Sequence, residues 1–319
     1  MSLRSRAVRI MIWKYANLNP DRTSNGGKII AYADKRTQSR SLSSKLMRVS
    51  CRTENGTCYE RVSLKGSLPN GRAIYYIHGG AFFAALNPYY LNLAESFCHA
   101  MGGGEVVFVD YGVTPENKYP TQLDQADDVW TEITERLGYK AENVIIGGDS
   151  AGGNLTLALM LKLRDQGRSM PKGGFGISPW TDMTAEGESY YFNYNNDVMF
   201  GNKKGKADDE LRKKLITSEL FSYAKELIYE ERRSPYVSPV FGKYNGFPPM
   251  FFTVGEHEML LSDTLTVAEK LRAENVEVNV DIGKKMFHIY ALFPSQLPEA
   301  KRSFDKLTKF ISKHLRVTR

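Results

Sequence analysis

The residues best suited to do chemistry in this chain are the hexapeptide Gly-Asp-Ser-Ala-Gly-Gly at positions 148–153. Residues 144–146 before it form a β-branched run typical of a buried strand, and the apolar stretch 154–160 after it is typical of a helix. A serine between two glycines at such a strand-to-helix turn is typical of a nucleophile elbow, where small neighbours let the two backbones approach closely. The pattern therefore predicts that Ser150 is a nucleophile beside a helix N-terminus, whose dipole favours developing negative charge.

A serine nucleophile needs a histidine base, and the chain contains five histidines. His288 follows the predicted strand 276–282, at the start of the loop that should connect the last strand to the last helix. This gives the chain order serine, acid, histidine of α/β-hydrolases, so we expect His288 to be the base. The other four lie in a glycine loop, in helix-like stretches or beside the candidate acids: His78, His99, His314 and His257.

An acid that orients the base should follow the penultimate strand, predicted at 250–254. The segment Gly-Glu-His-Glu at 255–258 is in that position. Glu258 and Asp263 are the two main candidates, and Glu256 is a third. The position of these carboxylates after the strand, rather than their residue type, carries this prediction.

Amide donors for a tetrahedral oxyanion are predicted in the segment His-Gly-Gly-Ala-Phe at 78–82, directly after a predicted strand. Glycines expose their N–H groups without a Cβ in the way, so Gly79 and Gly80 are candidate donors. Ala151, the residue after the nucleophile, should supply a third donor. One such donor is worth about 3–4 kcal/mol of the activation barrier.

The composition is that of a globular protein with one large core. Of the 319 residues, 42% are apolar and 25% are charged, which suits a single α/β domain. The three cysteines lack metal-ligand spacing, so we expect free thiols and no bound metal. No apolar run reaches the roughly 18–20 residues of a membrane span, and we expect a cytoplasmic protein without stable membrane insertion.

The net charge of +7 is concentrated near the N-terminus. Residues 1–50 carry eleven Lys/Arg against two Asp, a local charge of +9, so the remaining 269 residues sum to about −2. We interpret this as the solvated face of a lid helix, with attraction to acidic partners or a membrane surface as the alternative. No nucleic-acid-binding motif accompanies the charge, so we expect no nucleic-acid partner.

Strand and helix patterns alternate from residue 46 onward, which predicts an α/β fold. We expect a mostly parallel, doubly wound sheet of about eight strands, covered by helices on both faces, with the first two strands forming an antiparallel hairpin at its edge. The predicted strands are 46–52, 57–64, 73–77, 106–109, 144–146, 174–177, 250–254 and 276–282. The predicted helices between and after the later strands are 122–137, 155–166, 263–274 and 298–315.

Between residues 183 and 247 this alternation stops. The stretch is rich in Tyr, Asn, Lys and Glu, with aromatic residues crowded between 190 and 200 and a charged helix predicted over 208–229. An insertion of this length inside a compact sheet protein predicts a subdomain. We interpret it as a lid over the active site.

The N-terminal segment is predicted to begin with an amphipathic helix, because apolar residues recur at helical spacing. The residues concerned are Val8, Met11, Ile12 and Tyr15. A polar stretch over 20–45 should form a mobile connection to the core. The predicted organisation is therefore an N-terminal lid segment, a hydrolase core in two parts and a lid insertion: 1–45, 46–182 with 248–319, and 183–247.

These motifs together resemble the hormone-sensitive-lipase-like branch (bacterial family IV) of α/β-hydrolase esterases. The resemblance covers most of the chain, and the motifs that carry it are 78–82, Asp110-Tyr111 with Pro115-Glu116, 148–153 and 178–182. It implies an α/β-hydrolase fold with a lid built from the N-terminal helix and the insertion. It also implies hydrolysis of short acyl esters through an acyl-serine intermediate, without metal or cofactor.

The resemblance also bears on the acid. The family position, at which most members carry Asp, matches Glu258 here, thirty residues before His288, and Asp263 is the fallback. Two positions depart from the family pattern. Ala81 replaces the commoner third glycine, and Gly112 stands where the family usually has Arg.

The expected function is that of a serine carboxylesterase acting on a small-molecule ester. The aromatic lid predicts a pocket for an apolar or ring-bearing alcohol, with a small acyl group. A non-catalytic binding protein on the same fold is the rival class, and an amide deacetylase or a lipase are alternatives within the fold. A homo-oligomer is compatible with this sequence.

Overall fold

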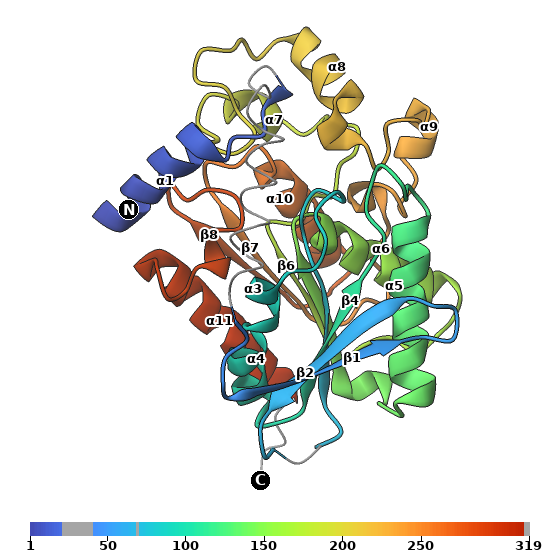
Figure 1. Ribbon diagram of the computed structural model, residues 1–319. Coiled ribbons are helices and arrows are strands. Elements are labelled where there is room, and N and C mark those ends of the chain that lie inside the picture. The colour runs from blue at the N-terminus through green and yellow to red at the C-terminus, as the bar shows by residue number, and fades with distance from the viewer. Residues whose placement is uncertain (21–40, 68–69, 316–319) are drawn as a thin grey trace.

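A twisted sheet runs through the computed structural model, with helices packed on both of its faces (Figure 1). The structure describes residues 1–20, 41–67 and 70–315. Within this part of the chain, the sheet has eight strands in the order β1-β2-β4-β3-β5-β6-β7-β8. The strands are β1 (Leu46–Arg52), β2 (Cys58–Leu64), β3 (Ala73–Ile77), β4 (Glu105–Asp110), β5 (Val144–Asp149), β6 (Gly173–Ile177), β7 (Met250–Gly255) and β8 (Val278–Gly283).

The pairing of the strands confirms the predicted α/β-hydrolase sheet. β1 pairs antiparallel with β2, and β2 antiparallel with β4, whereas the pairs from β4 through β8 are parallel. The central strands β3, β5 and β6 are buried along their whole length, as expected for parallel strands covered on both faces. The carboxyl ends of β5, β6 and β7 therefore meet at one edge of the sheet.

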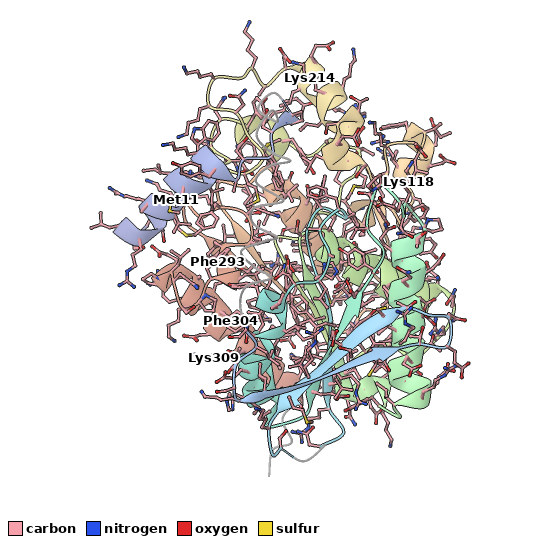
Figure 2. The ribbon with its side chains drawn as sticks, viewed as in Figure 1. Met11, Lys118, Lys214, Phe293, Phe304 and Lys309 are labelled. Atoms are coloured by element: carbon pink, nitrogen blue, oxygen red, sulfur yellow. The ribbon has the colours of Figure 1, made fainter. Side chains whose placement is uncertain are left out.

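Helices α5, α6 and α10 pack on one face of the sheet, and α4 and α11 on the other. The larger helices are α1 (Leu3–Tyr15), α4 (Ala94–Met101), α5 (Thr121–Thr131), α6 (Ala151–Asp165), α10 (Leu261–Ala273) and α11 (Pro298–Leu315). The predicted helix over 122–137 ends as an α-helix at Thr131 and continues as one π-helical turn, Glu132–Arg136. In Figure 2, Phe304 of α11 points into the core whereas Lys309 points outward.

The insertion between residues 183 and 247 consists of short elements above the carboxyl ends of the strands (Figure 1). The predicted single helix over 208–229 is wrong. α8 ends at Thr217 because Ser218 adopts an extended conformation, with φ −77° and ψ 163°. The short elements here are α7 (Ser189–Phe192), α8 (Asp209–Thr217), α9 (Tyr229–Arg232) and the 3₁₀ turns Glu219–Phe221 and Pro239–Phe241.

The N-terminal helix α1 lies beside this insertion (Figure 1). Val8 and Ile12 pack against the core as predicted, but Met11 and Tyr15 are 57% and 53% exposed. The most buried position of the helix is instead Ser5, whose hydroxyl donates to Glu299 at 2.8 Å. Most of the predicted connection over 20–45 lies outside the described residues.

The remaining described elements are α3 (Pro88–Leu91) and the 3₁₀ turns Ala141–Asn143 and Tyr290–Leu292. Cys51, Cys58 and Cys98 are free thiols. Among the described helices, none has the length and apolar character needed to cross a membrane.

Candidate active site

Ser150 occupies the turn between β5 and α6, at the carboxyl edge of the sheet. Its φ of 52° and ψ of −119° are unusual for a residue with a side chain, which is the backbone signature expected of a nucleophile elbow. Small neighbours are required here, since a Cβ on Gly152 would lie 2.0 Å from the carbonyl oxygen of Ile77. The local structure is thus the predicted strand-to-helix turn.

His288 connects the serine to a carboxylate. Its Nε2 lies 2.8 Å from Ser150 Oγ, and its Nδ1 lies 2.8 Å from Glu258 Oε2. All three side chains are buried, with exposures of 4% for Ser150, 2% for His288 and 0% for Glu258. The geometry is that of a nucleophile, a base and an orienting acid in a continuous hydrogen-bonded row.

The Glu258 carboxylate is further held by groups at the ends of two strands. Its Oε1 accepts a hydrogen bond from Ser178 Oγ at 2.8 Å and another from the amide of Gly255, the last residue of β7. Ser178 Oγ also accepts from the amide of Ile289, the residue after His288, at 3.0 Å. That Ser178 belongs to this site was not predicted from the sequence. Its position directly after β6 was the signal that could have indicated it.

The other two candidate acids do not contact His288. Asp263 Oδ2 accepts from the amides of Thr181 and Asp182 at 2.7 and 2.9 Å, and burial raises the pKa of its carboxyl. Glu256 Oε2 accepts from the amide of Lys285 at 2.8 Å. Of the three carboxylates considered, the structure therefore brings Glu258 alone to the imidazole.

In the loop at 78–82, one amide predicted to bind the oxyanion already has an acceptor. The N–H of Gly79 donates to Asp149 Oδ1 at 3.0 Å, so it is not free for a substrate oxygen. Within the described part of the chain, the amides of Gly80 and Ala81 have no acceptor. The amide of Ala151 belongs to the first turn of α6, where intrahelical acceptors are absent. Three amides thus remain available, with Ala81 in place of Gly79.

Asp149 links the nucleophile elbow to this loop. Besides Gly79, it accepts hydrogen bonds from Tyr76 Oη at 2.8 Å and Tyr90 Oη at 3.0 Å. Burial disfavours the charged carboxylate and raises its pKa to about 6, although the three hydrogen bonds oppose this shift. The network holds the loop at a fixed distance from the turn that carries Ser150.

His78 supports the same loop from its other side. Its ring stacks on Tyr111, with centroids 4.2 Å apart and an interplanar angle of 4°. Its Nδ1 lies 2.7 Å from the Gly79 carbonyl, and Tyr111 Oη donates to the carbonyl of His78 at 2.8 Å. Burial lowers the pKa of His78 to about 4, so the ring is neutral near pH 7. This environment fits the structural part expected for His78.

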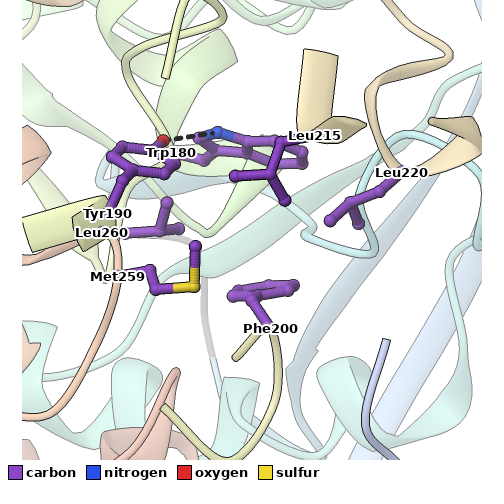
Figure 3. Close-up of a pocket in the computed structure, with 7 residues that line it drawn as sticks. All are labelled: Trp180, Tyr190, Phe200, Leu215, Leu220, Met259 and Leu260. Atoms are coloured by element: carbon purple, nitrogen blue, oxygen red, sulfur yellow. Dashed lines mark hydrogen bonds between the residues drawn. The ribbon is translucent and has the colours of Figure 1, made fainter. Parts of the chain in front are cut away.

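A small apolar pocket lies between the insertion and the segments that follow β6 and β7 (Figure 3). Phe200 contacts His288 edge to face, with ring centroids 4.8 Å apart. Trp180 donates from Nε1 to Tyr190 Oη at 3.1 Å, which fixes both rings in the wall. The residues that line the pocket are Trp180, Tyr190, Phe200, Leu215, Leu220, Met259 and Leu260.

No group of three or more His, Cys, Asp or Glu side chains within residues 1–20, 41–67 and 70–315 is arranged to hold a metal ion.

Comparison with known proteins agrees with this fold. Residues 74–292 match the model of a family described as having the alpha/beta hydrolase fold. An esterase of Acinetobacter venetianus is 32% identical over 77% of this chain and 77% of its own length. An acetyl-hydrolase of Streptomyces hygroscopicus is 27% identical over 76% of each chain.

The fold has solved counterparts that cover nearly the whole chain. A hormone-sensitive lipase from a metagenome library shares 25% identity and a TM-score of 0.81 over 99% of both chains. An esterase from the bacterial hormone-sensitive lipase family superimposes with a TM-score of 0.82 at 24% identity, which shows likeness of fold. The chain belongs to the alpha/beta hydrolase fold family, within its hormone-sensitive-lipase-like branch, and it is a carboxylic ester hydrolase.

Proposed function

We propose that Ser150 is the nucleophile of this esterase, His288 its general base and Glu258 the acid that orients the base. The observation that carries the proposal is the row of two 2.8 Å contacts from Ser150 Oγ through the imidazole to Glu258. His288 accepts the proton of Ser150 while the serine attacks the ester carbonyl, and it then protonates the leaving alcohol. Water repeats these steps on the acyl-serine and releases the acid.

The oxyanion is stabilised in this proposal by the amides of Gly80, Ala81 and Ala151. Gly79 has a different part, because its amide is already bonded to Asp149. It fixes the loop so that the following two amides keep their orientation. Preorganised donors of this kind act without reorganisation at the moment of reaction, which makes each of them worth several kcal/mol.

Glu258 performs its part as a buried and fully hydrogen-bonded carboxylate. The bonds from Ser178 and Gly255 occupy Oε1, which leaves Oε2 to accept from His288 Nδ1. This arrangement selects the tautomer with the proton on Nδ1, so Nε2 can accept the serine proton. It also stabilises the imidazolium that forms during attack.

We infer further that the enzyme prefers esters of short acyl groups, acetyl or butyryl, with an apolar or ring-bearing alcohol. The aromatic ring of Phe200 against His288 supports an apolar substrate group. The name of the Streptomyces relative, an acetyl-hydrolase, supports a small acyl group. Residues 1–45 and 183–247 act as the lid in this proposal, and the contacts of Phe200 with His288 support that assignment.

Rates for p-nitrophenyl acetate, butyrate, octanoate and decanoate test the acyl preference. The proposal expects the highest kcat/KM for acetate or butyrate, and a preference for decanoate would favour a lipase instead. An aryl acetamide measured beside the matching aryl acetate tests the amide deacetylase alternative. Membership in a group of esterases favours an enzyme over the non-catalytic binding protein.

A further inference from the structure

Phe200 is the part of the insertion that comes closest to the proposed base. Its ring is 5% exposed and lies edge to face against His288, with centroids 4.8 Å apart. The same ring approaches Trp180, with centroids 6.2 Å apart. Phe200 also lines the apolar pocket (Figure 3). A shift of this ring would therefore change the space beside the imidazole.

Phe200 belongs to irregular backbone, whose carbonyls receive no hydrogen bonds from a helix or a sheet. The residues after α1 supply donors instead. The side-chain amide of Asn17 donates to the carbonyls of Val198 and Gly201 at 3.0 and 2.9 Å. That of Asn19 donates to the carbonyl of Phe200 itself at 2.8 Å. Each bond joins the N-terminal segment to a point more than 180 residues farther along the chain.

A backbone bond completes this contact, since the amide of Leu18 donates to the carbonyl of Met199 at 2.6 Å. Residues 17–19, which we call the strap, thus bind four consecutive carbonyls, 198 through 201. Asn17 and Asn19 are 6% and 1% exposed, which is unusual for asparagine. Buried amides and carbonyls that lose their partners are costly, so the strap and the 198–201 segment constrain each other.

The amides of this segment are bonded to Asp197. Its Oδ1 accepts from the amides of Met199 and Phe200 at 2.7 and 3.0 Å. Its Oδ2 accepts from the amide of Met259, the residue after Glu258, at 2.7 Å. The backbone that carries the Phe200 ring is therefore bonded both to the N-terminal strap and, through Asp197, to the loop of the proposed catalytic acid.

We propose that Asn17 and Asn19 are specificity-determining residues, which limit the size of the accepted ester by holding Phe200 against His288. The proposal rests on the proposed function, because Phe200 matters to specificity only if His288 serves the reaction. Neither asparagine reaches the reacting atoms, so both are positioning residues. Without the strap, the 198–201 segment relaxes and Phe200 moves away from His288. The kcat/KM for large esters then rises relative to that for small esters.

Two substrate series measure the effect. One varies the acyl group of p-nitrophenyl esters from acetate to octanoate, and the other varies the alcohol of acetate esters from methyl to naphthyl. For each series we compare kcat/KM for the largest ester with kcat/KM for the smallest. Phe200→Ala should raise this ratio by about tenfold or more in the series whose variable group contacts Phe200. Asn17→Ala and Asn19→Ala are then expected to raise that same ratio, by about threefold or more.

Asn195→Ala is the matched control. Asn195 also donates two side-chain hydrogen bonds to main-chain carbonyls of the insertion, at 2.7 and 3.0 Å, but to Asn202 and Gly205. It is exposed and does not touch the 198–201 carbonyls. Its removal should leave both substrate ratios unchanged, even where it lowers the melting temperature.

A purely structural part for the strap would give a different result. Asn17→Ala and Asn19→Ala would then lower the melting temperature, or lower kcat/KM equally for all esters, without changing either ratio, and the proposal would be overturned. Asn17→Ser and Asn19→Ser, which keep a donor on a shorter side chain, should shift the ratio less and serve where an alanine variant does not fold. Failure of the proposed function itself is recognisable, because Ser150→Ala would then hydrolyse these esters like the wild type.

Discussion

Glu258 Oε2 lies 2.8 Å from His288 Nδ1, whereas the carboxylate two positions earlier, Glu256, binds the amide of Lys285 instead. The two glutamates thus have the same chemistry and nearly the same position in the sequence, but one of them faces the imidazole. This difference gives a direct test of the acid.

Glu258→Gln should lower kcat by about 10³–10⁴-fold, because a neutral amide does not hold the imidazole in the required tautomer or stabilise its charged form. Glu256→Gln should keep kcat within about twofold of the wild type, since a loop contact away from the chemistry is usually worth little. Steady-state rates on p-nitrophenyl acetate compare the two. Equal losses in both variants would show that the loop, rather than the Glu258 carboxylate, matters.

The carboxyl of Asp149 should lower the free energy of unfolding as the pH rises, whereas a salt-bridged carboxylate raises it. Burial raises its pKa from 3.8 to about 6 in the folded protein. Between these values the folded state holds a proton that the unfolded chain has lost, so this contribution to stability is present below about pH 4 and disappears as the pH rises through 6.

An asparagine side chain at this position does not titrate, so Asp149→Asn should gain stability relative to the wild type by about 3 kcal/mol between pH 4 and pH 7.5. Urea unfolding of both proteins at the two pH values gives this difference, in which contributions of unchanged groups cancel. A stability difference that stays constant with pH would contradict the raised pKa. Both proteins should keep their fold, because the side-chain oxygen that the substitution retains can still accept from the amide of Gly79.

Arg232 is the main polar anchor inside the insertion. It is 5% exposed, and burial lowers the pKa of its guanidinium. Its donors reach four main-chain carbonyls at 3.1–3.2 Å: Leu227, Met183, Ile216 and Lys225. These bonds connect parts of the insertion that share no regular secondary structure.

Arg232→Met should therefore destabilise the insertion by about 2–4 kcal/mol, because buried carbonyls lose their partners. Limited proteolysis and hydrogen exchange should show the loss over residues 216–232 before the core unfolds. The neighbouring Arg233 is exposed and contacts Glu186 at 2.8 Å, so Arg233→Met should change little. Similar protection in the two variants would show that Arg232 is not the anchor.

The eight strands could be predicted from the sequence to within about two residues at most ends. The central strands β3 and β5 are buried on both faces and read as continuous apolar runs. The turn at Ser150 and the position of His288 beside it could be predicted from motif and chain order. Choosing Glu258 over Asp263 required the family resemblance. Both acids follow the same strand, and only the folded loop decides which one turns toward the imidazole.

Other features depend on contacts between distant segments and left no local pattern. The bond from Gly79 to Asp149 uses an amide that the motif alone marks as free. In the sequence Ser178 is an ordinary loop residue, and its hydrogen bond to Glu258 is visible only in the folded structure. The polar residues Asn17 and Asn19 suggest solvent exposure, yet they are buried because their acceptors come from the insertion.

The break of the predicted helix over 208–229 has a similar cause. The charged composition favours a helix, but Leu220 and Phe221 pack into the core cluster beneath the insertion. The edge-to-face contact of Phe221 with Trp180, at 4.7 Å between centroids, shows where this segment is held. Tertiary packing outweighs helix propensity here.

The most direct test of the account is the hydrolysis of p-nitrophenyl acetate, butyrate and octanoate by the wild type and by Ser150→Ala. Turnover by the wild type, highest for acetate or butyrate, should fall by about 10⁴-fold or more in the variant, because the nucleophile of the row is missing. Circular dichroism and thermal unfolding should show that the variant keeps its fold. Undiminished turnover in a folded Ser150→Ala protein would contradict the assignment of Ser150 as the nucleophile.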